Sequence, residues 1–333
     1  MKIRVIGHGG EGRFPFGASG PWKEFEKVLL SRGYQICSSD MAESADALIA
    51  HSYNPNIGKY LERNIIPKKK LFLVLWEPYV VETTRYKKEV LSKFGTTFAP
   101  SIEWAKKVNA HSFKWPQDVI PDEDVFVGWK ERNKRAVMVQ GNKFSARKGE
   151  LYSLRRRVIT NLGLSALDLY GTNWNKGLNF DWWHWSRSLL NSSFSEVSTR
   201  SFFGIGKKYR NYFGATDDKN KTLSQYKIAI VIENSADFIS EKLFDSIRSG
   251  CVSVYVGPNL EKYGIPKESA IQVDAKHEVI SSMVRSLLEK SDEELETTAR
   301  NQRVNLMKVS RDWNNTSVLS KLASDMLDIL EAS

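Results

Sequence analysis

The chain has 333 residues, of which 41% are hydrophobic and 26% are charged. These proportions are typical of folded soluble proteins and leave room for two domains, so they exclude a disordered or fibrous chain. The longest apolar run, residues 71–76, is much shorter than the about 20 residues that a membrane-spanning helix needs. Because the first residues also lack the pattern of a signal peptide, we expect a cytoplasmic protein.

Lysines and arginines number 49 against 39 aspartates and glutamates, which gives a formal net charge of +10. This charge suits an anionic partner: a nucleic acid, a phosphate-bearing substrate or an acidic membrane surface. The basic residues lie in short scattered runs, at Lys68–Lys70, Arg155–Arg157 and Lys207–Lys208, whereas nucleic-acid-binding proteins concentrate them in one stripe or tail. We therefore interpret each run as a solvent-exposed face and expect no nucleic-acid partner.

The first half of the chain alternates strands with amphipathic helices. An opening strand at Ile3–Ile6 precedes a helix that has Pro21 at its first position and Gly33 after its last turn. Further strands are predicted at Tyr34–Cys37, Ala47–Ala50, Leu71–Leu75 and Phe94–Phe98. Continuous apolar strands between helices are typical of a parallel sheet that is covered on both faces.

The second half repeats this alternation. A polar stretch at 129–135 precedes a new strand at Ala136–Val139, so we expect two domains, residues 1–132 and 133–333. The remaining predicted elements are a helix ending at Gly163, strands at Leu167–Tyr170, Ile228–Ile232 and Val252–Val256, and helices over 278–330. The long aromatic loop between residues 171 and 222 is of a length that is typical of functional loops.

A glycine-rich loop follows the first strand. Gly7, Gly9 and Gly12 match the dinucleotide-binding pattern G-x-G-x-x-G. The next helix begins only at Pro21, so its first N–H groups are too far along the chain to face a pyrophosphate at these glycines. We interpret the segment as a loop that lines a cleft, with Gly9 and Gly10 as candidate ligand-binding residues.

Nothing in the sequence points to a metal site or to a hydrolase. The five histidines and two cysteines lack the spacing of metal ligands. Neither a G-x-S-x-G elbow nor a G-x-x-x-x-G-K-[ST] phosphate loop occurs. The acidic pair Asp217–Asp218 lies in a polar stretch, and we interpret it as solvated. We therefore expect no metal.

The most informative segment is a strand, loop, helix and strand between residues 227 and 258. The predicted strand ends before Asn234, and a helix begins near Glu241 and Lys242, where backbone N–H groups favour an anion. A carboxylate suits sugar hydroxyls, and an ammonium suits phosphate. Each residue also has a purely structural interpretation: a turn former, a partner of the helix dipole and a surface charge.

Taken together, these residues resemble the signature of glycosyltransferase family ten, the α-1,3/1,4-fucosyltransferases. The matching positions are Tyr226-Lys227, Glu233-Asn234-Ser235, Asp237 to Leu243, Gly250 and Val254 to Gly257. The sequence departs from the family pattern with Ile228 and Ile232 at aromatic positions, Phe238 in place of tyrosine and Ser253 in place of proline. Phe238 keeps the ring packing at the donor and lacks the hydroxyl group.

The resemblance continues upstream at lower similarity. The segment 140–147 falls where the family has an arginine on the donor diphosphate, which implies this role for Arg147; a guanidinium group can hold phosphate oxygens in a bidentate manner. Tyr170 and Gly171 correspond to the next strand end of the donor site, and Trp174 follows them.

In the first half, the run Leu73-Val-Leu-Trp-Glu77-Pro78 is similar to the family strand that ends in the carboxylate proposed as the catalytic base. A glutamate directly after an apolar run loses part of its hydration, which suits a proton acceptor. The alternative is a solvated acid at a strand end.

The resemblance implies a GT-B-like fold, with two Rossmann-like α/β domains facing each other across a cleft. Residues 1–132 would bind the acceptor, an oligosaccharide or a lipid-linked glycan, and residues 133–333 a GDP-sugar. It implies transfer of L-fucose from GDP-L-fucose with inversion, in the synthesis of surface glycans or lipopolysaccharide and without a required cofactor. Glu77 would then accept the acceptor proton; Arg147 and Lys242 would offset the charge of GDP, and Asn234 and Glu241 would hold hydroxyls.

The loop tryptophans leave two interpretations open. Trp174, Trp182, Trp183 and Trp185 lie within twelve residues, and their rings either stack on an acceptor sugar or anchor the loop to the core. The candidate acceptor-binding residues are Gly9 and Gly10 of the glycine-rich loop together with Trp174, Trp182 and Trp183.

Two alternative functions remain at the level of the sequence. One is a transferase that uses another nucleotide-sugar, and the other is a non-catalytic binder of a polyanion or nucleic acid. The basic charge also predicts peripheral contact with an anionic membrane at its inner face. No sequence feature decides whether the last helices return to the first domain.

Overall fold

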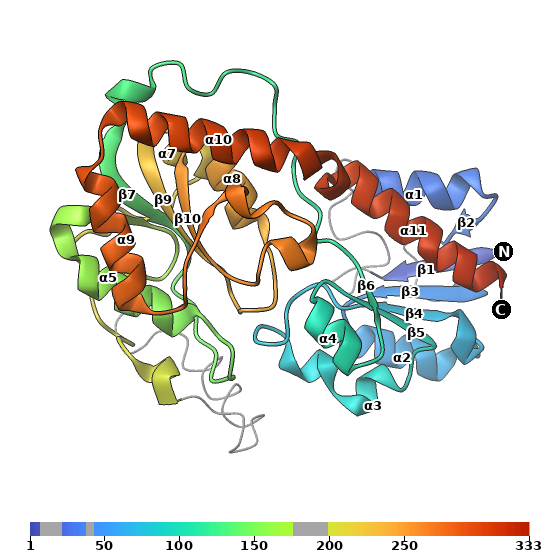
Figure 1. The fold of residues 1–333 in the computed structure, drawn as a ribbon. Helices are drawn as coiled ribbons and strands as arrows, with labels where there is room; N and C mark the ends of the chain where they lie inside the picture. The colour runs from blue at the N-terminus through green and yellow to red at the C-terminus, as the bar shows by residue number, and fades with distance from the viewer. Residues whose placement is uncertain (7–21, 38–42, 176–198, 333) are drawn as a thin grey trace. The chain divides into compact units, whose positions relative to one another are not determined.

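The computed structural model describes residues 1–6, 22–37, 43–175 and 199–332. The chain divides into two compact units: the first combines Met1–Asp118 with Asp312–Ser333, and the second is Val119–Arg311. Each unit contains a parallel sheet with helices packed against it (Figure 1). The predicted architecture of two Rossmann-like α/β domains is confirmed.

The first unit has six strands in the order β2-β1-β3-β4-β5-β6, and all neighbouring pairs are parallel. The strands are β1 (Lys2–Ile6), β2 (Gln35–Ile36), β3 (Ala47–His51), β4 (Leu71–Val74), β5 (Thr96–Ala99) and β6 (His111–Ser112). Every residue of β3 and β4 is buried, because helices cover both faces of the sheet. This burial explains why both strands read as continuous apolar runs.

Helices from both ends of the chain cover one face of this sheet. The helices of the unit are α1 (Trp22–Ser31), α2 (Pro55–Arg63), α3 (Lys88–Leu91), α4 (Ile102–Lys107) and α11 (Asn315–Glu331). Trp22 and Phe25 of α1 share one hydrophobic cluster with Leu322 and Met326 of α11 and with sheet residues such as Val5. The last helix therefore belongs to the first unit.

The second unit has five parallel strands in the order β11-β10-β9-β7-β8. The strands are β7 (Asn133–Val139), β8 (Leu167–Tyr170), β9 (Tyr226–Ile232), β10 (Val252–Val256) and β11 (Ile271–Gln272). The helices are α5 (Tyr152–Ala166), α7 (Lys219–Leu223), α8 (Glu241–Arg248), α9 (His277–Glu289) and α10 (Asp292–Ser310). Side chains of β9 alternate between two hydrophobic clusters: Ile230 packs with Val158 of α5, and Ala229 packs with Leu223 of α7.

The helix after β7 breaks where the sequence predicts, at Gly163. This residue has φ +69°, a left-handed conformation that glycine adopts without a steric penalty, and one more turn follows it up to Ala166. The predicted strands at the sheet edge are shorter in the structure: β2 keeps only Gln35–Ile36 of the segment 34–37.

Two of the three arginines in the run Arg155–Arg157 are buried, so the prediction of a solvent-exposed run is wrong there. Arg155 and Arg156 are each 1% exposed. Arg156 donates hydrogen bonds to the carbonyl oxygens of Phe203 (2.5 Å) and Lys143 (3.0 Å). Helical periodicity identifies the apolar face of a helix, but it does not reveal which loop carbonyls a long cation reaches.

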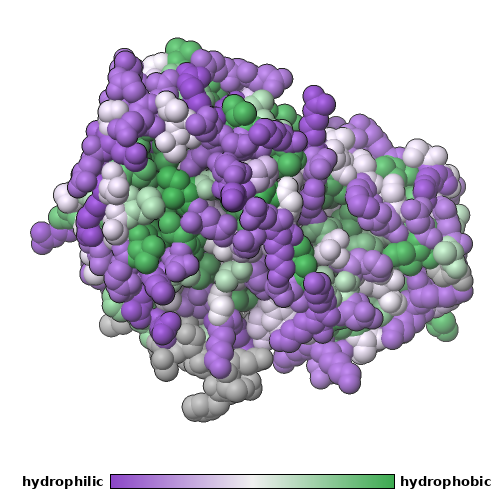
Figure 2. All heavy atoms as spheres, in the orientation of Figure 1, coloured by the Kyte–Doolittle hydropathy of each residue, from purple (hydrophilic) through white to green (hydrophobic). Residues whose placement is uncertain are grey.

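Hydrophilic residues cover most of the face that Figure 2 shows. Among the helices that the structure describes, none is both long enough and apolar enough to cross a membrane.

Candidate functional site

The carboxyl ends of β7, β8 and β9 bring most of the predicted donor-binding residues together. Gln140 follows β7, Gly171 follows β8, and Asn234 follows β9, while α8 begins beside them with Glu241 and Lys242. In open parallel sheets, ligands bind at this edge. The helix N-terminus adds partial positive charge to it.

Glu233 anchors the start of α8. Its side chain is fully buried and accepts hydrogen bonds from the backbone N–H (3.0 Å) and the hydroxyl group (2.6 Å) of Ser240, the N-cap residue. Lys242 Nζ lies 3.7 Å from Glu233 Oε2 and donates to Ser240 Oγ at 2.7 Å. Burial raises the pKa of Glu233, and the charge of Lys242 and the bonds from Ser240 act against this rise. The ammonium group of Lys242 is thereby fixed at the helix N-terminus.

A second lysine, Lys219 of α7, holds Glu241 from the opposite side. Lys219 Nζ lies 3.2 Å from Glu241 Oε1 and 3.1 Å from Asp245 Oδ2. Burial opposes ionisation of Glu241, but Lys242 and Lys219 outweigh it and hold the pKa of this carboxyl below its usual range. The sequence did not single out Lys219, because only the packing of α7 against α8 brings it to the site.

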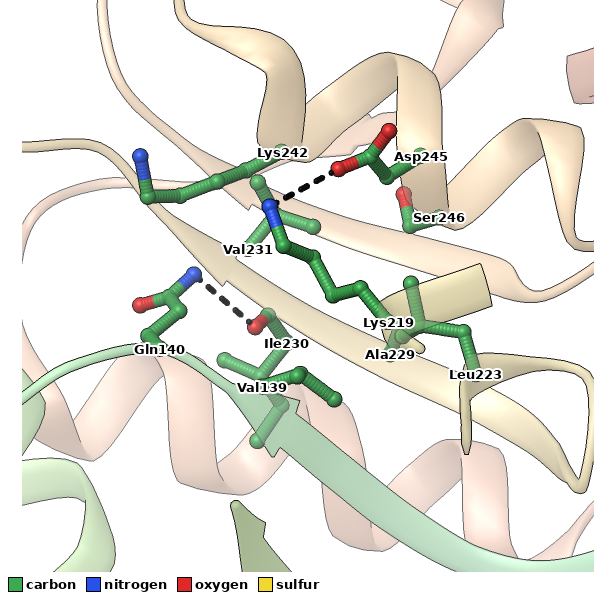
Figure 3. Close-up of a pocket in the computed structure, with 10 residues that line it drawn as sticks. All are labelled: Val139, Gln140, Lys219, Leu223, Ala229, Ile230, Val231, Lys242, Asp245 and Ser246. Carbon is green, nitrogen blue, oxygen red and sulfur yellow. Dashed lines mark hydrogen bonds and ion pairs between the residues drawn. The ribbon is translucent and has the colours of Figure 1, made fainter. Parts of the chain in front are cut away.

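Lys219, Lys242 and Asp245 line a small, solvent-open pocket (Figure 3). Its charged and polar walls come from α7, α8 and the end of β7, and its apolar floor comes from β7 and β9. The lining residues are Val139, Gln140, Lys219, Leu223, Ala229, Ile230, Val231, Lys242, Asp245 and Ser246. The lining combines two lysine cations, the Asp245 carboxylate that pairs with Lys219, the Gln140 amide and an apolar surface.

Asn234 is fixed by Arg155. The guanidinium group donates to Asn234 Oδ1 (3.0 Å), to the Ile232 carbonyl (2.7 Å) and to the Gly141 carbonyl (3.3 Å). The Asn234 carbonyl also accepts a bond from the backbone N–H of Leu151 (3.0 Å). Arg155 therefore ties the loop after β7 to the end of β9, a role that the sequence analysis missed.

Arg147 and Phe238 lie in the same unit but are buried. Each is 1% exposed. The position of Phe238 agrees with ring packing, the role expected of a residue that lacks the family hydroxyl group. The Arg147 carbonyl accepts a hydrogen bond from the Glu150 N–H (3.3 Å) in the loop that precedes α5.

Tyr170 and Gly171 shape the end of β8 in different ways. The Tyr170 hydroxyl lies 3.1 Å from that of Tyr226, and its ring stacks on Phe213, so the hydroxyl is engaged within the protein. Gly171 has φ +126°, and a Cβ atom there would lie 2.2 Å from the Gln140 carbonyl oxygen. Only glycine allows the loops after β7 and β8 to approach this closely.

Trp174 is a core residue, which corrects its assignment as a candidate acceptor platform. Its side chain is completely buried, its Nε1–H donates to the Gln140 carbonyl oxygen (2.6 Å), and its ring meets the Tyr209 ring edge to face. This is the anchoring alternative of the two that the sequence left open. The other candidate acceptor residues, Gly9, Gly10, Trp182 and Trp183, lie outside the described residues.

In the first unit, Glu77 follows β4 at the carboxyl edge of the sheet and is half-buried. Its carbonyl oxygen accepts a hydrogen bond from the Tyr86 hydroxyl (2.9 Å). Arg85 lies nearby: burial lowers its pKa to about 10, and the negative charge of Glu77 acts in the opposite direction. A positive charge therefore interacts with the predicted base.

A partly buried network holds Arg85 in place. Arg85 forms an ion pair with Glu82 and donates from Nε to the Tyr53 carbonyl (2.9 Å). Glu82 in turn accepts a hydrogen bond from the Ser52 hydroxyl (2.9 Å). Ser52 has φ +61° at the end of β3, an uncommon conformation for a residue other than glycine. Backbone strain of this kind is concentrated at functional sites.

Within the described ranges, no group of three or more His, Cys, Asp or Glu side chains is arranged to hold a metal ion.

A comparison with known families finds a match for part of the second unit. Residues 184–311, which include β9, α8 and β10, match the family described as "Glycosyltransferase family 10 (fucosyltransferase) C-term". This match supports the family 10 resemblance for that part of the chain. The resemblance seen in the sequence is thereby confirmed, and the protein is a glycosyltransferase. A comparison with curated proteins finds no match.

Solved structures share the fold of the whole chain. An α1,3-fucosyltransferase has 14% identity and a TM-score of 0.55, with 99% of this chain and 90% of that chain covered. An α1,3-fucosyltransferase with GDP has 12% identity and a TM-score of 0.54, with 99% of this chain and 90% of that chain covered. Anabaena HepE in complex with UDP-glucose has 11% identity and a TM-score of 0.55, with 98% of this chain and 99% of that chain covered. The segment that matches family 10 thus lies within a GT-B-like fold.

Proposed function

We propose that the protein transfers L-fucose from GDP-L-fucose to a hydroxyl group of an acceptor glycan, with inversion at the anomeric carbon. The observation that carries this proposal is the cluster of Glu233, Ser240, Glu241 and Lys242 at the carboxyl end of β9, inside the segment that matches family 10. The similar fold of an α1,3-fucosyltransferase with GDP supports a GDP-sugar as the donor.

In this proposal the second unit binds the donor. Lys242 and Arg147 neutralise the diphosphate. Glu241 accepts hydrogen bonds from hydroxyl groups of the donor, and the Asn234 side-chain N–H group donates to them. Phe238 contributes packing, and Gly171 lets the two loops close around the site. Because Arg147 is buried in this structure, its role requires that donor binding uncover the guanidinium group.

The proposed reaction needs one base and no redox step. Glu77 takes the proton from the acceptor hydroxyl as that oxygen forms a bond to the anomeric carbon of fucose. The bond between this carbon and the β-phosphate oxygen breaks on the opposite face, and GDP leaves with the electron pair. The transition state has oxocarbenium character, so fixed positive charge near the departing GDP lowers the barrier. Acceptor binding is proposed for residues 1–132.

A transfer assay with four donors tests the proposal. GDP-fucose, GDP-mannose, UDP-glucose and UDP-galactose are each incubated with the protein and an array of glycans, and the products are identified by mass spectrometry. We expect product from GDP-fucose alone, with the anomeric configuration opposite to that of the donor by NMR. Product from a UDP-sugar alone would contradict the donor, and retained configuration would contradict the mechanism.

A further inference from the structure

The first residue after β7, Gln140, is held on three sides. Its N–H donates to the Tyr170 carbonyl (3.0 Å), and its own carbonyl oxygen accepts from Trp174 Nε1 (2.6 Å). The whole residue is only 4% exposed, and the side-chain Nε2 donates to the Ile230 carbonyl (3.5 Å). The amide group therefore has a defined position at the carboxyl edge of the sheet.

The side-chain oxygen of Gln140 differs from these groups. Oε1 is buried, and it accepts no hydrogen bond from any residue that the structure describes. Gln140 lines the same pocket as Lys219 and Lys242 (Figure 3), but Lys242 donates to Ser240 and Lys219 pairs with Glu241 and Asp245. A buried acceptor without a donor destabilises the protein, so such a group calls for an explanation.

Another buried glutamine shows what a structural role looks like in this fold. Gln302 of α10 is 3% exposed, and both ends of its amide are paired with the backbone of Ser253. Its Oε1 accepts from the Ser253 N–H (2.8 Å), and its Nε2 donates to the Ser253 carbonyl (3.3 Å). Gln140 is buried to a similar extent and pairs only its Nε2 group, and the residue lines the pocket of the candidate donor site.

We propose that Gln140 is a specificity-determining residue, whose Oε1 accepts a hydrogen bond from a hydroxyl group of the bound nucleotide-sugar. This proposal rests on the proposed function. An amide oxygen pairs only with N–H or O–H donors, and an ionised diphosphate has none. The groups next to the diphosphate that Lys242 binds are the ribose on one side and the transferred sugar on the other, and both carry hydroxyls. An uncharged acceptor can bind such a hydroxyl group without repelling the diphosphate.

Replacement of Gln140 by methionine tests the proposal. Met has a similar length and lacks the acceptor oxygen; Gln225→Met, at an exposed position of the same unit, is the matched control. Affinities for GDP and GDP-fucose are measured by isothermal titration calorimetry, and thermal unfolding without ligand checks that each variant is folded. We expect Gln140→Met to lose about tenfold or more in affinity for GDP-fucose, the cost typical of a lost buried hydrogen bond, and Gln225→Met to match the unmodified protein.

The two ligands distinguish the source of the hydroxyl. An equal loss for GDP and GDP-fucose assigns the bond to the ribose, and a loss for GDP-fucose alone assigns it to the fucose. Unchanged affinity for both overturns the proposal for Gln140. If the unmodified protein binds neither ligand, the proposed donor is wrong instead.

Donor analogues that lack one hydroxyl group test the same proposal in the unmodified protein. One deoxy analogue of GDP-fucose, on the ribose or on the fucose, is expected to bind about tenfold more weakly than its parent, and Gln140→Met is expected to bind the two equally. This arm remains decisive if Gln140→Met fails to fold, because equal binding of every analogue by the unmodified protein contradicts the proposal.

Discussion

Glu241 is ionised at the site because two lysines outweigh its burial. Its pKa is held below the ordinary value near 4.5, so its ionised form stabilises the folded protein above that pH, and this stabilisation is lost as the pH falls toward the depressed folded-state pKa. Asp245 shares Lys219: burial raises the pKa of Asp245, and Lys219 limits the rise.

Substitution of Lys219 by methionine is expected to destabilise the protein most at neutral pH. Without Lys219 the pKa values of Glu241 and Asp245 both rise, so the difference in unfolding free energy, on the order of 1 kcal/mol at pH 7 for a partly exposed pair, shrinks as the pH falls to about 4. Urea unfolding from pH 7 to pH 4 measures it. Lys221→Met, at an exposed position of the same helix, is the control; a difference that grows at low pH would contradict this account.

Glu77 is the residue on which the proposed chemistry depends. Glu77→Gln keeps the shape of the side chain and removes the base, so turnover is expected to fall by ~10² or more while affinity for GDP-fucose stays within about twofold. Steady-state kinetics and calorimetry separate the two effects, with Glu62→Gln on the exposed surface of α2 as the control. Preserved turnover together with weakened donor binding would exclude Glu77 as the base.

At the scale of elements, Arg155 joins the ends of two strands that are far apart in the sequence. Its guanidinium group bonds the Ile232 carbonyl and the Asn234 side chain after β9, and the Gly141 carbonyl after β7. The planar guanidinium group has five N–H donors in a fixed fork, so it can bond these three separated acceptors at once.

Arg155→Met is therefore expected to cost about 3 kcal/mol or more of unfolding free energy, because several buried acceptors lose a charged donor. Arg157, the neighbour whose guanidinium group lies over the Phe203 ring at 4.5 Å, provides the comparison: Arg157→Met is expected to cost under about 1 kcal/mol. Guanidinium chloride unfolding of both variants measures the two costs. Equal costs would contradict the expectation that the buried hydrogen bonds of Arg155 stabilise the folded protein.

Sequence periodicity predicted the central strands well and the polar contacts poorly. The runs at 71–75 and 228–232 are apolar throughout because helices cover both faces of each sheet, and this pattern is local. The burial of Arg155 and Trp174 depends instead on carbonyl groups contributed by distant loops. Lys219 reaches Glu241 only through the packing of α7 on α8, and no local pattern contains this information.

At the scale of the whole molecule, the first unit is built from both ends of the chain. The last helix, α11, buries Leu322 and Met326 in the cluster that contains Trp22 and Val5. The amphipathic pattern of residues 315–331 predicts that one face is buried, but it does not say against which sheet. The family signature likewise identified the second unit, and in the first unit it extended only to the strand before Glu77.

Leu322→Ala is expected to destabilise the first unit by about 2–5 kcal/mol, since it leaves a cavity between α11 and the sheet. Leu164, which is 52% exposed, is the control position, where alanine is expected to cost less than about 0.5 kcal/mol. Chemical unfolding followed by tryptophan fluorescence measures both variants. Equal stability of the two would contradict the packing of α11 on the first sheet.

We propose that GDP-fucose binds at the carboxyl edge of the second sheet through Lys242. Calorimetric titration of GDP-fucose into the unmodified protein and into Lys242→Met tests this claim most directly. We expect saturable binding by the unmodified protein and an affinity at least about tenfold weaker in the variant, because a fixed cation at the diphosphate is lost. No binding by the unmodified protein, or the same affinity in both, would contradict it.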